Sequence, residues 1–236
     1  MLERAVEAGI ERILVPGWDI ASSERALELA TLHGPLIQAA VGVHPHDAGQ
    51  MDEAGWRRLE ELVGDSACSA VGEIGLDFHR NLSSPESQHE AFGRQLDLAA
   101  AADRPVLVHD REAHGEVTRA LLAWTGRMSG SARGALHAFS GDAGMALELV
   151  AAGYLISFAL PVSFRRAVGP RAAAAEIPPG SFLVETDAPY LGPDKEARNE
   201  PTTALRVAAE LAQLRGSDPD AIAREAREAY DRLIVR

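Results

Sequence analysis

The chain has 236 residues, of which 46% are hydrophobic and 25% are charged, as is ordinary for a soluble globular protein. No apolar run approaches the roughly 18 residues that a membrane-spanning helix needs, and the single cysteine, Cys68, excludes an internal disulfide and a cysteine-rich zinc module. The net charge of −12 argues against a broad basic face that grips duplex nucleic acid. We therefore expect a cytoplasmic protein with no membrane association and no obligate protein partner.

Residues 1–10 have the pattern of the last part of a helix, and short apolar runs then recur along the chain. The runs cover residues 12–17, 37–45, 69–77, 105–110, 134–140, 154–160 and 182–187. They are continuous rather than alternating, which is typical of parallel strands covered on both faces. We therefore expect seven parallel strands.

The segments between these runs have helical patterns. Candidate start and stop signals, in chain order, are Ser22 and Gly34, Ser84 and Pro85, Gly153, and Asp218 with Pro219. The last helix carries an apolar stripe made of Ile222, Ala226, Ala229 and Leu233.

This alternation predicts parallel βα units. Six units between residues 17 and 187 take about 28 residues each, close to the unit length of a closed (β/α)8 barrel of the TIM type. We expect a single barrel domain over residues 1–236. An open doubly wound sheet is the alternative, weakened because no Gly-rich phosphate loop follows a strand. Seven strands leave the barrel without its first strand, so either the protein lacks it or the sequence begins at an internal Met.

Polar side chains stand at the end of five of these strands. They are His44, His46, Glu73, Asp77, His109, Asp110, His137, Glu185 and Asp187. The carboxyl ends of parallel barrel strands face one mouth, where chemistry collects. Imidazoles and carboxylates from separate strands are ligands of Zn²⁺, Mn²⁺ and similar ions, and a bound cation would neutralise acids that end an apolar strand.

Glu185 and Asp187 share a face by strand alternation, with Thr186 pointing away. We expect Asp187, which is closer to the mouth, to bind the metal directly. We expect Glu185 to orient a metal ligand by hydrogen bonding without binding the metal itself.

Taken together, these motifs resemble the TatD family of metal-dependent deoxyribonucleases, in the amidohydrolase-like barrel superfamily. The stretches that carry the resemblance are "GVHPHD", "VGEIGLDFHRN", "PVLVHDREAH", "LHAFSGD", "LVETDAPYL" and "ARNEP", between residues 41 and 201. The chain departs from the pattern at its start, because many members open with a strand ending in His-x-His and no such pair stands upstream of residue 44.

The resemblance implies roles for individual residues. The metal ligands are Glu73, His109, His137 and Asp187, the catalytic base is Asp187, and the substrate-binding residues are His44, His46, Asp77 and Arg80. The cofactor would be one or two divalent cations, Mg²⁺, Mn²⁺ or Zn²⁺. The substrate would be DNA, single-stranded or at a 3′ end, digested from 3′ to 5′.

The expected reaction is hydrolysis of a phosphodiester by a metal-activated water, with Asp187 accepting the proton. Arg80 or Arg111 would steady the phosphate. One alternative is a small-molecule amidohydrolase on the same barrel. It is disfavoured because no lysine that could be carbamylated ends a strand, and Lys195 is the one lysine of the sequence. Another alternative is an inactive, N-terminally truncated fragment.

Overall fold

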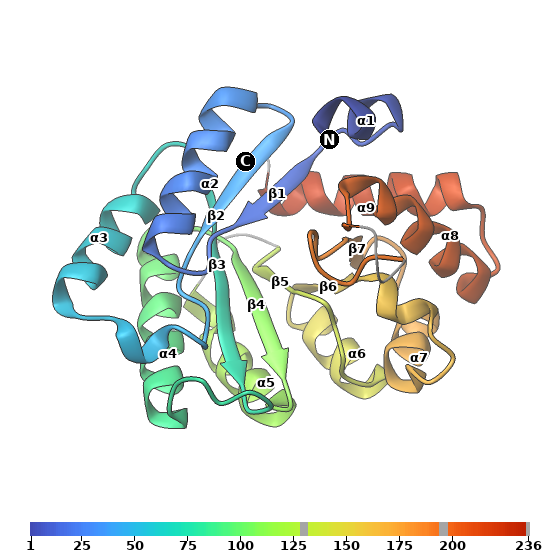
Figure 1. Ribbon diagram of the computed structural model, residues 1–236. Helices are drawn as coiled ribbons and strands as arrows, with labels where there is room; N and C mark the ends of the chain where they lie inside the picture. Colours follow the sequence, from blue (N-terminus) through green and yellow to red (C-terminus); the bar gives the residue numbers. More distant parts are fainter. Residues whose placement is uncertain (128–131, 194–197, 235–236) are drawn as a thin grey trace. The chain divides into compact units, whose positions relative to one another are not determined.

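The computed structural model describes residues 1–127, 132–193 and 198–234, which fall into two compact units (Figure 1). The β1–β5 unit comprises Arg12–Leu136 and Leu233–Arg236, and the β6–β7 unit comprises Met1–Glu11 and His137–Arg232. Lys195, which bears on the amidohydrolase alternative, lies outside the described residues.

The β1–β5 unit is built on parallel strands that pair in chain order. They are β1 (Ile13–Pro16), β2 (Ile37–Val41), β3 (Cys68–Asp77), β4 (Val106–Arg111) and β5 (Gly134–Leu136). Most of their residues are buried, as continuous apolar runs predict for strands covered on both faces. The pairing of β3 with β4 shifts register between Val71 and Ile74, around Glu73. Such irregularities are common beside functional sites.

Helices follow these strands and complete βα units. They are α2 (Ile20–His33), α3 (Glu53–Val63), α4 (Pro85–Ala101) and α5 (His114–Trp124), with short 3-10 turns η1 (Ala48–Gln50) and η2 (Thr125–Arg127). Helix α2 packs on β1 and β2, α4 on β3, and α5 on β4 (Figure 1). The predicted alternation is thus confirmed in this unit.

The start of α2 differs from the sequence prediction. Asp19, not Ser22, is the N-cap: its carboxylate accepts the Ser22 N–H at 2.7 Å, and Ser22 Oγ accepts the Asp19 N–H at 2.9 Å. This reciprocal pair satisfies two free N–H groups and moves the helix start three residues upstream. The predictions for Ser84 as N-cap and for Pro85 at the first helical position are confirmed.

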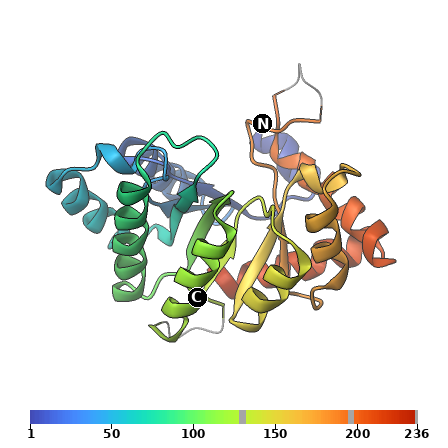
Figure 2. The ribbon, with the colours of Figure 1, turned by 90° about the horizontal axis from the view of Figure 1, so that it is seen from below.

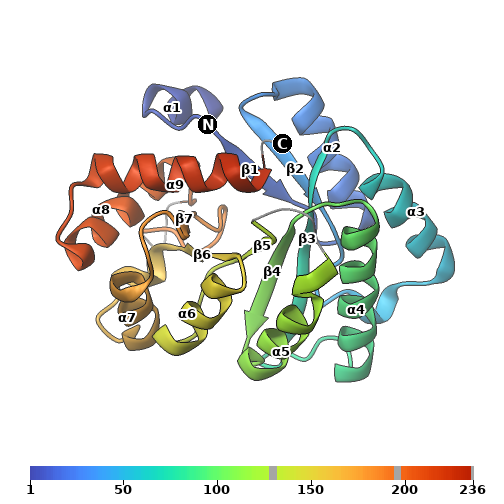
Figure 3. The same cartoon turned by 180° about the vertical axis from the view of Figure 1, so that it is seen from behind.

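The β6–β7 unit holds two parallel strands, β6 (Tyr154–Phe158) and β7 (Phe182–Val184). Its helices are α1 (Leu2–Glu7), α6 (Ala143–Ala151), α7 (Val168–Glu176), α8 (Ala204–Arg215) and α9 (Pro219–Ile234), with 3-10 turns η3 (Leu160–Ser163) and η4 (Pro201–Thr203). Helix α6 packs beside β6 (Figure 2). Gly216, in the left-handed region at φ 61°, ends α8 and lets the chain turn into α9 (Figure 3). The stripe predicted for α9 is buried.

All seven predicted strands exist, but three of them end three or more residues earlier than predicted. The runs 37–45, 134–140 and 182–187 are strands only as far as Val41, Leu136 and Val184. Ala138 and Asp187 have positive φ values of 42° and 57°, which a strand does not accommodate. The polar residues of these runs therefore lie in loops just after the strands. Among the described helices, none combines the length and the apolar run needed to cross a bilayer.

Candidate active site

Strand β3 brings two carboxylates, Glu73 and Asp77, against one imidazole on β4. His109 Nδ1 lies 2.8 Å from Glu73 Oε1, and His109 Nε2 lies 3.3 Å from Asp77 Oδ2. Gly75 pairs with His109 and has φ +140°, and a Cβ on Gly75 would lie 2.0 Å from the His109 carbonyl oxygen. Only glycine permits this approach of the two strands.

His44 joins Glu73 and His109 in a group with one ligand atom each, and these atoms all lie within 4.8 Å of one another. His44 Nε2 is 3.9 Å from Glu73 Oε1. Two imidazoles and one carboxylate are a donor set typical of catalytic zinc, and the same atoms also bind other first-row divalent ions. The residues present therefore fit a divalent cation.

The protonation of these side chains also favours the binding of a divalent cation. Burial lowers the pKa of His44 to about 3, against a smaller opposing effect of Glu73, so the imidazole is neutral at pH 7, the form that binds metals. His109 faces a carboxylate at each ring nitrogen, and a neutral imidazole has one N–H to donate. A divalent cation held by one nitrogen of His109 would leave the other nitrogen to bond a carboxylate.

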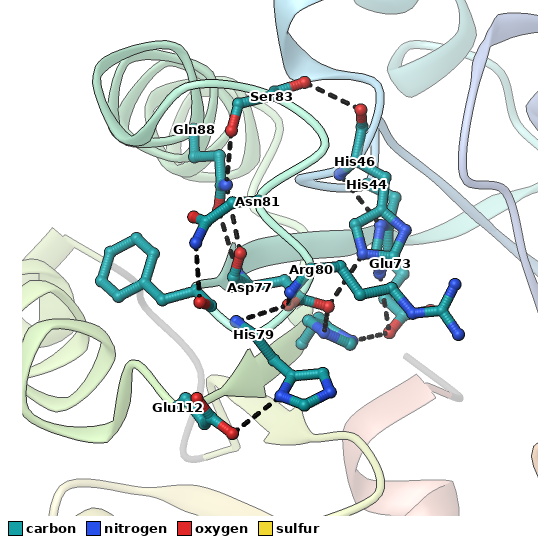
Figure 4. A network of polar contacts seen from close by, with 12 residues as sticks. His44, His46, Glu73, Asp77, His79, Arg80, Asn81, Ser83, Gln88 and Glu112 are labelled. Atoms are coloured by element: carbon teal, nitrogen blue, oxygen red, sulfur yellow. Dashed lines mark hydrogen bonds and ion pairs between the residues drawn. The ribbon is translucent and has the colours of Figure 1, made fainter.

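Asp77 is almost completely buried and fully engaged (Figure 4). His46 Nε2 lies 2.8 Å from its Oδ2, and its Oδ1 accepts the backbone N–H groups of His79 and Arg80 at 3.0 and 2.8 Å. Burial alone would raise the pKa of Asp77, but the hydrogen bonds from His109, Arg80 and His46 together lower it. Asp77 is therefore an anion that fixes the orientation of two histidines.

The loop after β3 presents exposed polar side chains next to this cluster. His79 Nδ1 lies 2.8 Å from Glu112 Oε1 in the loop after β4 (Figure 4). Among the residues the structure describes, the Arg80 guanidinium makes no hydrogen bond or ion pair, and it extends toward the His46 and Glu73 side chains (Figure 4). The pairing of His79 with Glu112 was not predicted, since nothing in either motif links them.

Asp110 was grouped with the strand-end residues, but its side chain lies elsewhere. It accepts a hydrogen bond from Ala113 N–H at 3.3 Å, and its Oδ2 is 2.8 Å from His114 Nδ1, at the start of α5. Successive residues of a strand point to opposite faces, so Asp110 supports α5 while His109 faces the cluster.

In the β6–β7 unit, His137 lies between two acids of the loop after β7. Its Nδ1 is 2.9 Å from Glu185 Oε2, and its Nε2 is 3.2 Å from Asp187 Oδ1. Glu185 also accepts hydrogen bonds from Ser157 Oγ and from Ala138 N–H. The Asp187 side chain is 31% exposed and that of Glu185 15%. As with His109, an imidazole between two carboxylates fits a cation at one nitrogen.

Asn199 holds the loop that carries Asp187. Its Nδ2 donates to the carbonyl oxygens of Thr186 and Tyr190, on either side of Asp187, and the side chain is buried. The stretch "RNEP" was recognised from sequence without a role for Asn199. The bonds show that it fixes the left-handed turn at Asp187.

The structure thus brings His44, His46, Glu73, Asp77 and His109 together in the β1–β5 unit. It brings His137, Glu185 and Asp187 together in the β6–β7 unit. Sequence reasoning chose all of these residues. The main difference is His44, expected to face the substrate, which stands in the group of possible metal ligands.

Comparison with known proteins gives one consistent family. The model of the family described as TatD related DNase matches residues 1–235. A relative from Cronobacter sakazakii named 3'-5' ssDNA/RNA exonuclease TatD is 38% identical over 93% of this chain and 84% of its own length. A Bacillus subtilis protein named uncharacterized metal-dependent hydrolase YabD is 35% identical over 99% of this chain and 91% of its own length.

A solved structure agrees. The crystal structure of YJJV, a TatD homolog from Escherichia coli, superposes with a TM-score of 0.90 at 32% identity, covering 100% of this chain and 90% of that one. The chain belongs to the family of TatD-related DNases.

Proposed function

We propose that this protein is a metal-dependent nuclease that hydrolyses phosphodiester bonds of single-stranded DNA from the 3′ end. The observation that carries the proposal is the group of His44, Glu73 and His109, whose ligand atoms lie within 4.8 Å of one another. Family membership supports it, and so does the name 3'-5' ssDNA/RNA exonuclease borne by relatives such as the one from Cronobacter sakazakii.

His44, Glu73 and His109 would hold one divalent cation, Mg²⁺, Mn²⁺ or Zn²⁺. His137 and Asp187 stay proposed as metal ligands of the β6–β7 unit, supported by the 3.2 Å between His137 Nε2 and Asp187 Oδ1. When bound, the cation would lower the pKa of a water molecule and offset charge on the phosphoryl oxygens.

Asp187 is the proposed base that accepts the proton of the attacking water. Its carboxylate is more exposed than that of Glu185 and is held by one imidazole nitrogen. Glu185 has Ser157 Oγ and Ala138 N–H as further partners, so it orients His137 rather than taking a proton.

Arg80 is the proposed phosphate contact, because its guanidinium is exposed and makes no ion pair among the described residues (Figure 4). His46 stays a proposed substrate contact, with 24% of its side chain exposed. Asp77 was also expected to bind substrate; its burial and its bonds to His46 and His109 instead favour a role in orienting these histidines.

The closed (β/α)8 barrel, its missing first strand, the single domain and the cytoplasmic location stay predictions. Parallel βα units in chain order support the barrel.

The test is digestion of a 5′-labelled single-stranded oligonucleotide with Mn²⁺, Mg²⁺ or Zn²⁺, and with EDTA. We expect cation-dependent shortening from the 3′ end, lost in His109→Ala and kept in Leu32→Ala, an exposed position on α2. Cleavage that persists in EDTA, or cation-dependent cleavage unchanged in His109→Ala, would overturn the proposal. Turnover of a cyclic amide with no cleavage of DNA or RNA would favour the amidohydrolase.

A further inference from the structure

Trp18 is an exposed tryptophan in a chain whose other tryptophans are buried. The exposed fraction is 56% for Trp18, 6% for Trp56 and 3% for Trp124, and the sequence has three tryptophans. Tryptophan is highly buried on average in folded proteins. An isolated exposed apolar residue needs no explanation by itself. A functional role for Trp18 must therefore be argued from its position in the fold.

Trp18 lies two residues after β1, joined by backbone hydrogen bonds to the possible metal ligands. Its carbonyl oxygen accepts the N–H of His44 at 2.8 Å, and the carbonyl oxygen of Gly17 accepts the N–H of Glu73 at 2.8 Å. The indole is therefore carried by the backbone that positions two of the three proposed metal ligands.

The backbone of Trp18 is also fixed from its N–H side. This group donates to Ser22 Oγ at 2.9 Å, and Ser22 belongs to the capping box with Asp19 at the start of α2. Because both the N–H and the carbonyl group of Trp18 are hydrogen-bonded, the position of its Cα is fixed. Such an aromatic group loses little conformational freedom when a flat ligand stacks on it.

We propose that Trp18 is a stacking surface for a nucleobase of the single-stranded substrate next to the hydrolysed phosphodiester; the inference rests on the proposed function. Every nucleobase has a π face, so stacking tolerates any sequence. It also needs no broad basic surface, which suits a chain of net charge −12. Trp18 would thereby supply part of the affinity that this acidic protein does not obtain from phosphate contacts.

The exposure of Trp18 makes stacking directly observable by fluorescence. In Asp187→Asn with Mg²⁺ present, whose turnover should be strongly reduced, we expect a single-stranded oligonucleotide to quench the emission and to shield it from acrylamide. Trp56 and Trp124 are too buried to account for this change. An oligonucleotide of equal length with abasic sites at its 3′ end is the matched ligand and should quench much less. Equal quenching by both ligands, or binding detected by anisotropy of a labelled oligonucleotide without shielding, would overturn the inference.

Steady-state kinetics give a second readout. Trp18→Ala should raise KM for an oligonucleotide about tenfold with little change in kcat, and Trp18→Phe should recover most of the loss. Leu32→Ala is the matched control, because Leu32 is a large exposed apolar residue in the last turn of α2, away from the end of β1.

The two proposals fail in different ways. If the wild type cleaves but Trp18→Ala keeps its KM, the stacking role is wrong and the nuclease stands. If the wild type neither cleaves nor binds an oligonucleotide, both proposals fall.

Discussion

His109 Nδ1 lies 2.8 Å from Glu73 Oε1, so the neighbouring strands β3 and β4 meet through side chains as well as through backbone pairing. The Glu73 N–H is in turn bonded to the carbonyl oxygen of Gly17 after β1. Glu73 is therefore held through its backbone by the segment after β1 and through its side chain by β4. A carboxylate fixed in this way is preorganised for a cation.

Glu73→Gln should lower the affinity for Mn²⁺ by more than about 100-fold, because an amide lacks the charge of a direct ligand and the loss of a supporting partner alone costs 10- to 100-fold. Titration calorimetry measures the affinity. Glu112→Gln is the control, since Glu112 is an exposed carboxylate of the same unit that contacts His79. Equal Mn²⁺ affinity in wild type and Glu73→Gln would remove Glu73 from the metal site.

Asp77→Asn tests whether the buried acid acts by orienting the histidines. We expect metal affinity about 10- to 100-fold lower with the fold retained, since an amide of the same shape does not hold both imidazoles as an anion does. Asp110→Asn is the matched control, because Asp110 is also a carboxylate at a strand end but contacts His114. A loss of oligonucleotide affinity with normal metal affinity would instead make Asp77 a substrate contact.

Most strands and the polar residues after them could be predicted from sequence. A continuous apolar run indicates a buried strand, and a His, Asp or Glu at its end indicates a site residue. The contacts of single residues could not. His44 belongs to the group of possible ligands because its Nε2 lies 3.9 Å from Glu73 Oε1 on β3, and the motif "GVHPH" does not encode that contact. The predicted start of α2 was wrong by three residues because Asp and Ser both cap helices, and here Asp19 is the N-cap while Ser22 bonds back to it.

Asp187→Asn should lower the turnover of an oligonucleotide by about 10²- to 10⁴-fold while the thermal midpoint stays close to that of the wild type. The amide cannot take the proton of the attacking water, but it fills the same space in the turn held by Asn199. Asp142→Asn is the control in the same unit, because Asp142 caps α6 and Asn caps equally well. Full turnover in Asp187→Asn would assign the base to another residue.

Cys68 reports on the stability of β3. Burial raises the pKa of its thiol from 9.0 to about 11. Because the folded-state pKa is the higher one, this contribution to stability is complete below pH 9 and is lost as the pH rises to about 11. We expect the urea midpoint of the wild type to fall from pH 8.5 to pH 10.5 by more than that of Cys68→Ala. A parallel fall in both proteins would contradict the burial of the thiol.

Gly75→Ala should destabilise the protein by at least about 3 kcal/mol, because it combines backbone strain with a steric clash. Gly75 has φ +140°, and its new Cβ would stand 2.0 Å from the His109 carbonyl oxygen, which is backbone and has no rotamer to yield. Urea denaturation measures the loss, and Mn²⁺ titration of the remaining folded protein should show weakened binding as β4 is displaced.

Gly93→Ala is the matched control for this substitution. Gly93 lies inside α4, and nothing stands within 4 Å of a Cβ added there. Alanine has the higher helix propensity, so this variant should gain about 0.5–1 kcal/mol. A Gly75→Ala protein as stable as Gly93→Ala would mean that β3 and β4 do not approach at His109. The contact between Glu73 and His109 would then lose its structural basis.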